Sequence, residues 1–194
     1  MKTMLYNSRD QLINHCIEIF QYKTYLEIGV NHSASCFDKI NCDKKVGVDP
    51  NMGGQHRMTS DEYFEKYNDK FDIIFIDGLH HAEQVYKDIE NSLNILNDGG
   101  TILMHDCNPL QEFRQFKDGA NGDCWKACVH YRQEPSLDMI TVNIDQGCGV
   151  IRVRKNQSPI KINKTYTDLQ WDDLVENRQN YLNLVSVQQF IDWL

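Results

Sequence analysis

Polar side chains that could do chemistry follow several apolar runs that have the length of buried strands. They are Glu27, Asp49, Asp77, His105 and Asp106. Near-continuous apolar runs such as residues 71–76 are typical of strands that are buried on both faces of a parallel sheet. Ligands of such sheets bind outside the carboxyl ends of the strands. We therefore expect these side chains to meet at one edge of a sheet and to form a site there.

The first of these strand ends, within residues 24–33, has the pattern of a nucleotide-binding βαβ unit. Gly29 lets the backbone turn sharply and approach a ligand closely. Asp49 follows the next strand, about 20 residues further on, where such units bind the hydroxyl groups of a ribose. Gly29 is the only glycine of the dinucleotide fingerprint that this chain has, and Glu27 stands at the first glycine position of that fingerprint. A carboxylate at that place repels a pyrophosphate and favours a ligand with an ammonium group.

The elements that must position these residues alternate between strands and helices, which predicts parallel βαβ units. Strands are expected at 24–28, 45–48, 71–77 and 101–104, and apolar residues at helical spacing predict helices near 8–20, 33–40, 59–67, 82–96 and 123–131. Two further β-rich segments, 137–144 and 148–153, are joined by a gap that permits a hairpin but no parallel crossover. The expected fold is a Rossmann-like, doubly wound α/β fold with helices on both faces and an antiparallel last strand.

The composition suits one domain, because 194 residues with 41 % hydrophobic content can form a sizeable core. We expect a core of about residues 8–155 and a C-terminal helical extension of about 160–194, with helices capped at Thr167 and Ser186. The net charge of −8 argues against a nucleic-acid partner, which needs a basic face.

No apolar run is long enough to span a bilayer, and the start of the sequence lacks the apolar core of a signal peptide. The seven cysteines are therefore read as reduced thiols. We expect a cytoplasmic protein that binds no membrane. The oligomeric state stays open, and a homo-oligomer is one of the alternatives.

Several motifs resemble the class I S-adenosylmethionine-dependent methyltransferases, and more closely the small-molecule and sugar O-methyltransferases that include macrocin O-methyltransferase-like enzymes. The motifs are residues 27–31, 59–62, 75–81, 105–109 and 122–127, together with the stretch from 177 to 194. The expected hairpin fits this class, because its sheet is parallel except for the last strand. The first motif of the class ends in glycine, and Ser33 replaces that glycine here.

The resemblance implies that S-adenosylmethionine is the cofactor and that the acceptor is a hydroxyl group of a small molecule or sugar. The residues that would bind the cofactor are Glu27, Gly29, Asn31, Ser33, Asp49, Ser60, Asp61 and Asp77. Of these, Asp49 would take the ribose hydroxyls, Ser60 and Asp61 would lie near the adenine, and Asp77 would lie under the sulfonium.

The resemblance also raises the question of a metal. Some related enzymes hold a divalent cation, here expected to be Mg²⁺, with acids at the positions of Asp77 and Asp106. In those relatives a further Asp or Asn follows the second acid directly. Cys107 follows it in this chain, and a thiol is a poor ligand for a hard cation. Metal dependence therefore stays an open alternative.

Methyl transfer from a sulfonium is an in-line displacement in which the protein mainly aligns the acceptor oxygen with the methyl group. A neutral histidine can take the acceptor proton. His81 is the first candidate for this base and His105 the second, with Asp106 orienting or assisting, although either histidine could instead be a cap or a strand-end residue. The connection 107–122 is expected to close over the acceptor.

Two other functions stay open from the sequence. One is a dinucleotide-dependent oxidoreductase, against which Glu27 argues. The other is a Rossmann-like module that binds a cofactor without catalysis, against which the set of acids at the strand ends argues. Fold alone cannot decide between them.

Overall fold

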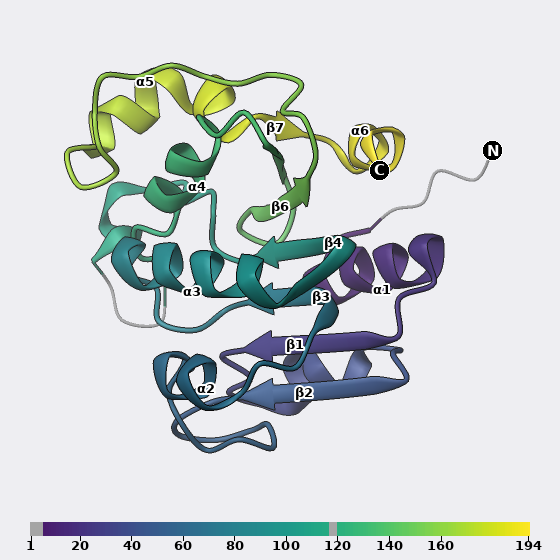
Figure 1. Cartoon of the computed structure of the whole chain (residues 1–194). Coiled ribbons are helices and arrows are strands. Elements are labelled where there is room, and N and C mark those ends of the chain that lie inside the picture. Colours follow the sequence, from purple (N-terminus) through teal and green to yellow (C-terminus); the bar gives the residue numbers. More distant parts are fainter. Residues whose placement is uncertain (1–5, 117–119) are drawn as a thin grey trace.

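The computed structural model describes residues 6–116 and 120–194. A seven-stranded sheet runs through the protein in the order β2-β1-β3-β4-β6-β5-β7 (Figure 1). Its strands are β1 (Thr24–Ile28), β2 (Lys44–Val48), β3 (Phe71–Ile76), β4 (Leu96–Met104), β5 (Leu137–Val142), β6 (Cys148–Val153) and β7 (Leu184–Val185). The first four are parallel, and β6 lies antiparallel between β4 and β5. The predicted α/β fold with a mostly parallel sheet is confirmed.

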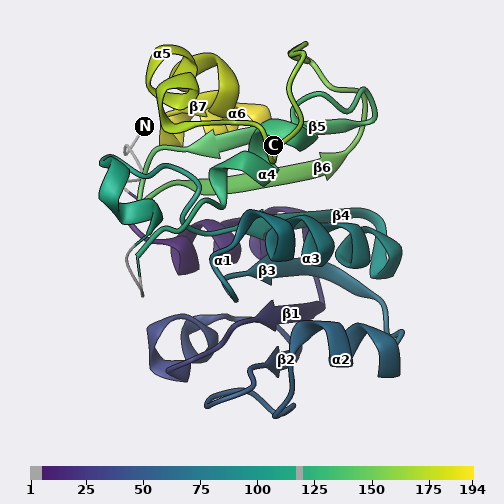
Figure 2. The same cartoon turned by 90° about the vertical axis from the view of Figure 1, so that its left-hand side faces the viewer.

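Helices cover both faces of the sheet because successive side chains of a buried strand point to opposite sides. Ile74 and Ile76 of β3 belong to the core that α3 and α4 cover, whereas Ile73 and Phe75 belong to the core under α1 and α6. Figure 2 shows the strands stacked from β2 to β5, with α5 and α6 at the β7 end. The helices are α1 (Arg9–Phe20), α2 (Ser60–Lys66), α3 (Ala82–Ile95), α4 (Trp125–Tyr131), α5 (Trp171–Leu182) and α6 (Val187–Trp193).

The carboxyl ends of the parallel strands are level with one another. Ile28 pairs with both Val48 and Ile76, and Ile76 pairs with Met104. The residues that follow these four ends therefore emerge at the same edge of the sheet. This register is what brings distant parts of the sequence into one site.

The segment expected to be a helix at 33–40 instead forms two short 3-10 turns, η1 (Ser33–Ser35) and η2 (Phe37–Lys39). The hydroxyl of Ser33 donates to the carboxylate of Asp38 over 2.8 Å. Local bonds of this kind compete with the regular hydrogen bonds of a helix. The two turns keep Phe37 buried, as the expected helix would have done.

Two other boundaries differ from the sequence expectation. Strand β4 begins at Leu96, directly after α3, rather than at Thr101. Helix α5 begins at Trp171 because Gln170 and Asp173 form its capping box, and Thr167 does not cap it. The capping box expected at Ser186 is confirmed. Among the described residues, no helix is both long enough and apolar enough to cross a membrane.

Candidate active site

A cavity of about 460 Å³ lies over the carboxyl ends of β1 and β2. Its size falls within the range of about 300–1,000 Å³ that is usual for small-molecule sites. Predicted cofactor residues on the strand side of the cavity are Gly29, Asn31 and Asp49, and those on α2 are Ser60 and Asp61. The structure therefore brings these five residues together around one space.

Gly29 is required where the chain leaves β1 close beside the end of β3. Its φ of +86° lies in the region that favours glycine, and a Cβ atom there would stand 2.2 Å from the carbonyl oxygen of Asp77. Any side chain at this position would push the two strand ends apart. The glycine thus keeps the turn close to the floor of the cavity.

Asp49 organises the loops that border the cavity. Its Oδ1 accepts backbone N–H groups from Asn51 and Met52, both at 2.8 Å, and its Oδ2 accepts that of Asn31, also at 2.8 Å. A carboxylate offers about four acceptor positions. One position on Oδ2 therefore remains for a hydroxyl group of a ligand such as a ribose.

Three predicted cofactor residues, Glu27, Ser33 and Asp77, do not line this cavity. Glu27 is only 1 % exposed, does not line the cavity and accepts a hydrogen bond from the hydroxyl of Tyr25. Burial raises the pKa of Glu27 to about 8, and the hydrogen bond from Tyr25 offsets only part of this rise. Ser33 is bound to Asp38 and lines neither this cavity nor the one described below. The structure thus places the side chains of Glu27 and Ser33 away from the cavity.

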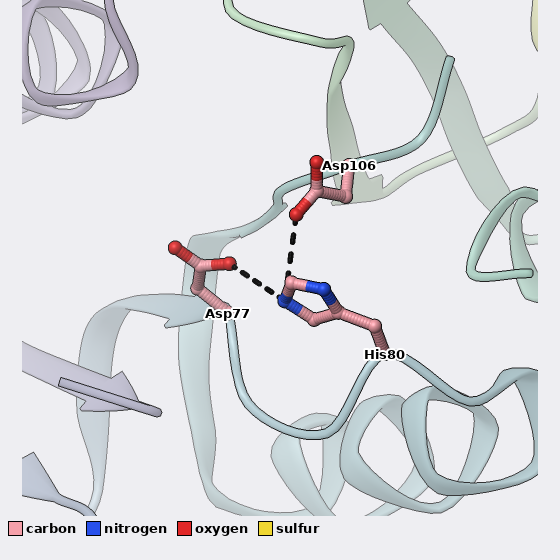
Figure 3. Close-up of side chains that lie close together, drawn as sticks. All are labelled: Asp77, His80 and Asp106. Carbon is pink, nitrogen blue, oxygen red and sulfur yellow. Dashed lines mark ion pairs between the residues drawn. The ribbon is translucent and has the colours of Figure 1, made fainter. Parts of the chain in front are cut away.

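A cluster of two acids and one histidine lies at the ends of β3 and β4 (Figure 3). The Nε2 atom of His80 is 3.4 Å from Oδ1 of Asp77 and 3.4 Å from Oδ2 of Asp106. Its other ring nitrogen, Nδ1, lies 2.5 Å from the carbonyl oxygen of Ala120, to which it can donate. A hydrogen bond with Asp77 raises the pKa of His80 to about 8, although burial opposes the change.

His105 is a second histidine against the same two acids. Its Nδ1 atom is 3.1 Å from Oδ2 of Asp106 and 3.3 Å from Oδ1 of Asp77, and its Nε2 is 3.4 Å from Oδ1 of Asp145. Burial alone would lower the pKa of His105, but Asp106, Asp145 and Asp77 surround the ring and raise it to about 12. His105 as a residue is 6 % exposed and lines neither cavity.

These two observations make His105 a poor proton acceptor, because it stays protonated at neutral pH. It is instead a fixed positive charge between the acids. Burial would raise the pKa of Asp77, but hydrogen bonds from His105 and His80 outweigh this and hold it at about 2. Asp77 therefore remains a carboxylate at every physiological pH.

Asp106 occupies an unusual backbone conformation with φ of +59°. Its side chain is held on both sides, since Asn121 donates to Oδ1 over 2.9 Å and His105 contacts Oδ2. A non-glycine residue at positive φ costs about 1–3 kcal/mol and persists only when its surroundings fix it. The conformation turns the carboxylate toward Asp77 and His80.

A second cavity of about 650 Å³ adjoins the first. Asn31, Gly78 and Leu79 line both spaces. His80 and His81 also line the second cavity, which Gln115 and Phe116 border from the long connection after β4 and Trp171 borders from α5. Residues 117–119 of this connection, which was expected to close over the acceptor, lie outside the described residues.

The C-terminal extension is fixed to this site. Arg178 of α5 donates to the side-chain oxygen of Asn108 over 2.6 Å and to the carbonyl oxygen of Pro109 over 2.7 Å. Its guanidinium also lies over the ring of Trp171, 5.4 Å from the centroid. The helix thereby holds an aromatic face at the rim of the second cavity.

The sequence singled out His81, which the structure places at the mouth of the second cavity. His81 is the exposed N-cap residue of α3, and its side chain makes no capping bond. His80, which the sequence interpretation passed over, points inward to the two acids (Figure 3). The signal that could have found it is a histidine three residues after a strand-end acid, with Gly78 in the turn between them.

The cluster has donors that suit a divalent cation. Asp77, His80 and Asp106 each offer one ligand atom, and these atoms lie within 4.8 Å of one another. Two carboxylates and an imidazole suit Mn²⁺ or Zn²⁺ better than Mg²⁺, which prefers oxygen ligands alone. Cys107 is not part of this set, because its buried thiol donates to the carbonyl oxygen of His105.

Comparison with known proteins now adds to the geometry. Residues 15–107 match the family model of a methyltransferase domain. Among solved structures, an O-methyltransferase from Bacillus cereus in complex with S-adenosylhomocysteine has 12 % identity and a TM-score of 0.56, covering 79 % of this chain and 84 % of that one. The O-methyltransferase TomG from Streptomyces achromogenes, involved in tomaymycin synthesis and bound to S-adenosylmethionine, has 12 % identity and a TM-score of 0.55, with 79 % and 83 % covered.

A third neighbour is the S-adenosylhomocysteine-bound methyltransferase PaMTH1 from Podospora anserina. It has 14 % identity and a TM-score of 0.55 over 77 % of this chain and 80 % of that one. No curated protein matches the chain. These structures confirm the predicted Rossmann-like fold, and the match over residues 15–107 shows that this part of the chain is similar to a methyltransferase domain.

Proposed function

We propose that this protein transfers the methyl group of S-adenosylmethionine to a hydroxyl group of a small molecule or sugar. The junction of the two cavities carries this proposal. Asn31, Gly78 and Leu79 line both spaces, so a cofactor in the first would direct its methyl group into the second. Similar solved proteins that hold S-adenosylmethionine or S-adenosylhomocysteine support the choice of cofactor.

The cofactor would lie along the carboxyl ends of the strands. Asp49 would accept a ribose hydroxyl at its free acceptor position, and Ser60 and Asp61 would border the adenine. Asp77 precedes Gly78 at the junction and keeps its negative charge, which complements a sulfonium. The chain's part in the displacement is then to align an acceptor oxygen in the second cavity with the methyl group.

His80 is the residue we propose as general base. Its Nδ1 faces the carbonyl oxygen of Ala120, which leaves Nε2 to take the acceptor proton. The imidazolium that forms would face Asp77 and Asp106, so two carboxylates would stabilise it. A base whose pKa of about 8 lies near the working pH is well matched to this task.

A divalent cation, if it binds, would be held by Asp77, Asp106 and His80. Such an ion would lower the pKa of the acceptor hydroxyl directly. His105 competes with this arrangement, because its protonated ring already contacts Oδ1 of Asp77 and Oδ2 of Asp106. We therefore propose that the two acids serve a histidine base and that the cation is dispensable.

The second cavity suits a polar ring with an apolar face. Gln115, Asp123 and Gln170 offer hydrogen bonds along its wall, and the indole of Trp171 lies among them. Polar groups fix the orientation of a ligand, whereas an aromatic face supplies contact area. A sugar or a similar polyhydroxy compound combines both requirements, which is why we propose this acceptor class.

Calorimetry with S-adenosylhomocysteine and with NADH tests the proposal. We expect S-adenosylhomocysteine to bind to one site per chain and NADH to give no heat. The variant Gly29→Ala should bind S-adenosylhomocysteine more weakly than the wild type. A side chain at this position would collide with Asp77 and disturb the floor of the cavity. Tight binding of NADH without binding of S-adenosylhomocysteine would favour the oxidoreductase instead.

A further inference from the structure

Arg9 is the first residue of α1 and reaches the edge at which the strands end. Its Nη1 donates to Oδ2 of Asp145 over 3.2 Å, and its backbone N–H donates to the same oxygen over 3.0 Å. Nη1 is also 3.2 Å from Nε2 of His105, so the two cations share Asp145. The Nε atom lies 3.6 Å from Oδ2 of Asp77, the residue before the junction of the two cavities.

The Nε edge of this guanidinium makes no hydrogen bond, since its 3.6 Å contact with Asp77 is an ion pair that is too long for one. Nε is buried and has no hydrogen-bond partner, and within residues 6–116 and 120–194 no partner bonds to Nη2 either. Nε–H and one N–H of the adjacent Nη2 point in the same direction in the planar fork of an arginine. Such a pair of parallel donors is the geometry that binds a carboxylate in bidentate fashion.

The cofactor brings a carboxylate that the rest of the site does not suit. Its methionine part carries an ammonium, a sulfonium and a carboxylate, and Asp77, Asp106 and Asp145 would attract the first two and repel the third. Arg9 lies near the end of β1, which leads into the glycine turn. Burial raises the pKa of Glu27 in this strand, and the charge of Arg9 offsets part of the rise. Arg9 lines neither cavity itself, but its guanidinium lies against Asp77, the residue before the junction, and so places a cation directly behind that junction.

We propose that the free Nε and Nη2 edge of Arg9 binds the α-carboxylate of the cofactor, an inference that rests on the proposed function. Other cations near the first cavity are less suited. His32 is exposed directly before η1. Arg57 is exposed beside Met58, on the side of the cavity that Thr59 and Ser60 border at the start of α2. Neither lies among the acids that hold the guanidinium of Arg9 in place.

The experiment compares two ligands that differ only in this carboxylate. Calorimetry measures the dissociation constants of S-adenosylhomocysteine and of its decarboxylated analogue for the wild type, Arg9→Gln, Arg9→Lys and Arg57→Gln. Hydrogen bonds to charged groups correspond to a preference of roughly tenfold to a hundredfold. We expect the wild type and Arg57→Gln to prefer S-adenosylhomocysteine by this factor, and Arg9→Gln to bind both ligands with similar affinity.

The comparison separates a binding role from a structural one. If Arg9 only stabilises the fold, Arg9→Gln will weaken both ligands equally and retain the preference, which would overturn the inference. Equal affinities in the wild type would overturn it as well, without any variant having to fold. Arg9→Lys keeps the charge but loses the fork, so it should retain only part of the preference.

Failure of the proposed function has a different signature. If the wild type binds neither ligand, the proposed cofactor is wrong and the role of Arg9 falls with it. If the wild type binds S-adenosylhomocysteine but Arg9 makes no difference, the proposed function stands and only this inference fails. A structure of the complex would also decide, since the guanidinium and carboxylate should lie about 2.7–2.9 Å apart.

Discussion

Replacing His80 by Gln tests the proposed base. Gln can still donate an N–H group but cannot take up a proton, so we expect methyl transfer to slow by roughly 10²–10⁴-fold. Affinity for S-adenosylhomocysteine should change little, because His80 lines the second cavity and not the first. In the wild type, kcat/KM should rise with pH and level off above about 8, since the neutral form of His80 is active and its pKa is about 8. The variant should lack this ionisation.

The same substitution should alter stability in a pH-dependent way. The pKa of His80 in the folded protein is about 8, above its ordinary value of 6.5, so the acids stabilise its charged form. This contribution is fully present below pH 6.5 and is lost as the pH rises through 8. Its upper limit is about 2 kcal/mol, and the partial exposure of the ring lowers it to about 1 kcal/mol. Urea unfolding at pH 6 and pH 9 should show the gap between wild type and variant shrinking.

His81→Gln is the matched control, because it makes the same change at the neighbouring residue. His81 is exposed and its side chain makes no capping bond, so this variant should keep a rate near that of the wild type. The assay is transfer of a labelled methyl group to an acceptor found by screening glycosides and polyols. A full rate in His80→Gln, or a loss in His81→Gln alone, would refute the assignment of the base.

Three further predictions concern the cofactor turn, the ribose and the cation. Gly29→Ala should lower the free energy of unfolding by about 2–4 kcal/mol, measured by urea titration, because it combines positive φ with a collision against Asp77. Asp49→Ala should weaken binding of S-adenosylhomocysteine by about 1–3 kcal/mol in calorimetry, and an unchanged affinity would remove it as the ribose ligand. Methyl transfer should survive a chelator, and a loss that Mn²⁺ or Mg²⁺ restores would assign Asp77 and Asp106 to a cation.

The strands and the edge that carries the site could be predicted from the sequence, since both depend on local patterns. An apolar run of the right length marks a buried strand, and in a parallel sheet the residue that follows it must emerge at the carboxyl edge. Asp49 and Asp77 lie at this edge for this reason. Glu27 obeys the same pattern, but its side chain points into the core, where Tyr25 binds it.

The details of the site depend on packing that no local pattern records. His80 and His81 are neighbours, yet the His80 side chain turns inward to the two acids, whereas His81, the N-cap residue of α3, stays exposed and makes no capping bond. Arg9 and Asp145 are separated by 136 positions in the sequence and meet because α1 and the turn after β5 share one end of the sheet. Short elements such as β7 were missed because two residues carry no periodic signal.

The most direct test of the account is a structure of the protein with bound S-adenosylhomocysteine. We predict that the adenosine part occupies the first cavity, with a ribose hydroxyl at Asp49, and that the sulfur faces the second cavity beside Asn31 and Gly78. The Nε2 atom of His80 should then be reachable from the space next to the sulfur. Binding of the molecule in any other place, or a sulfur turned away from the second cavity, would contradict the proposed methyl transfer.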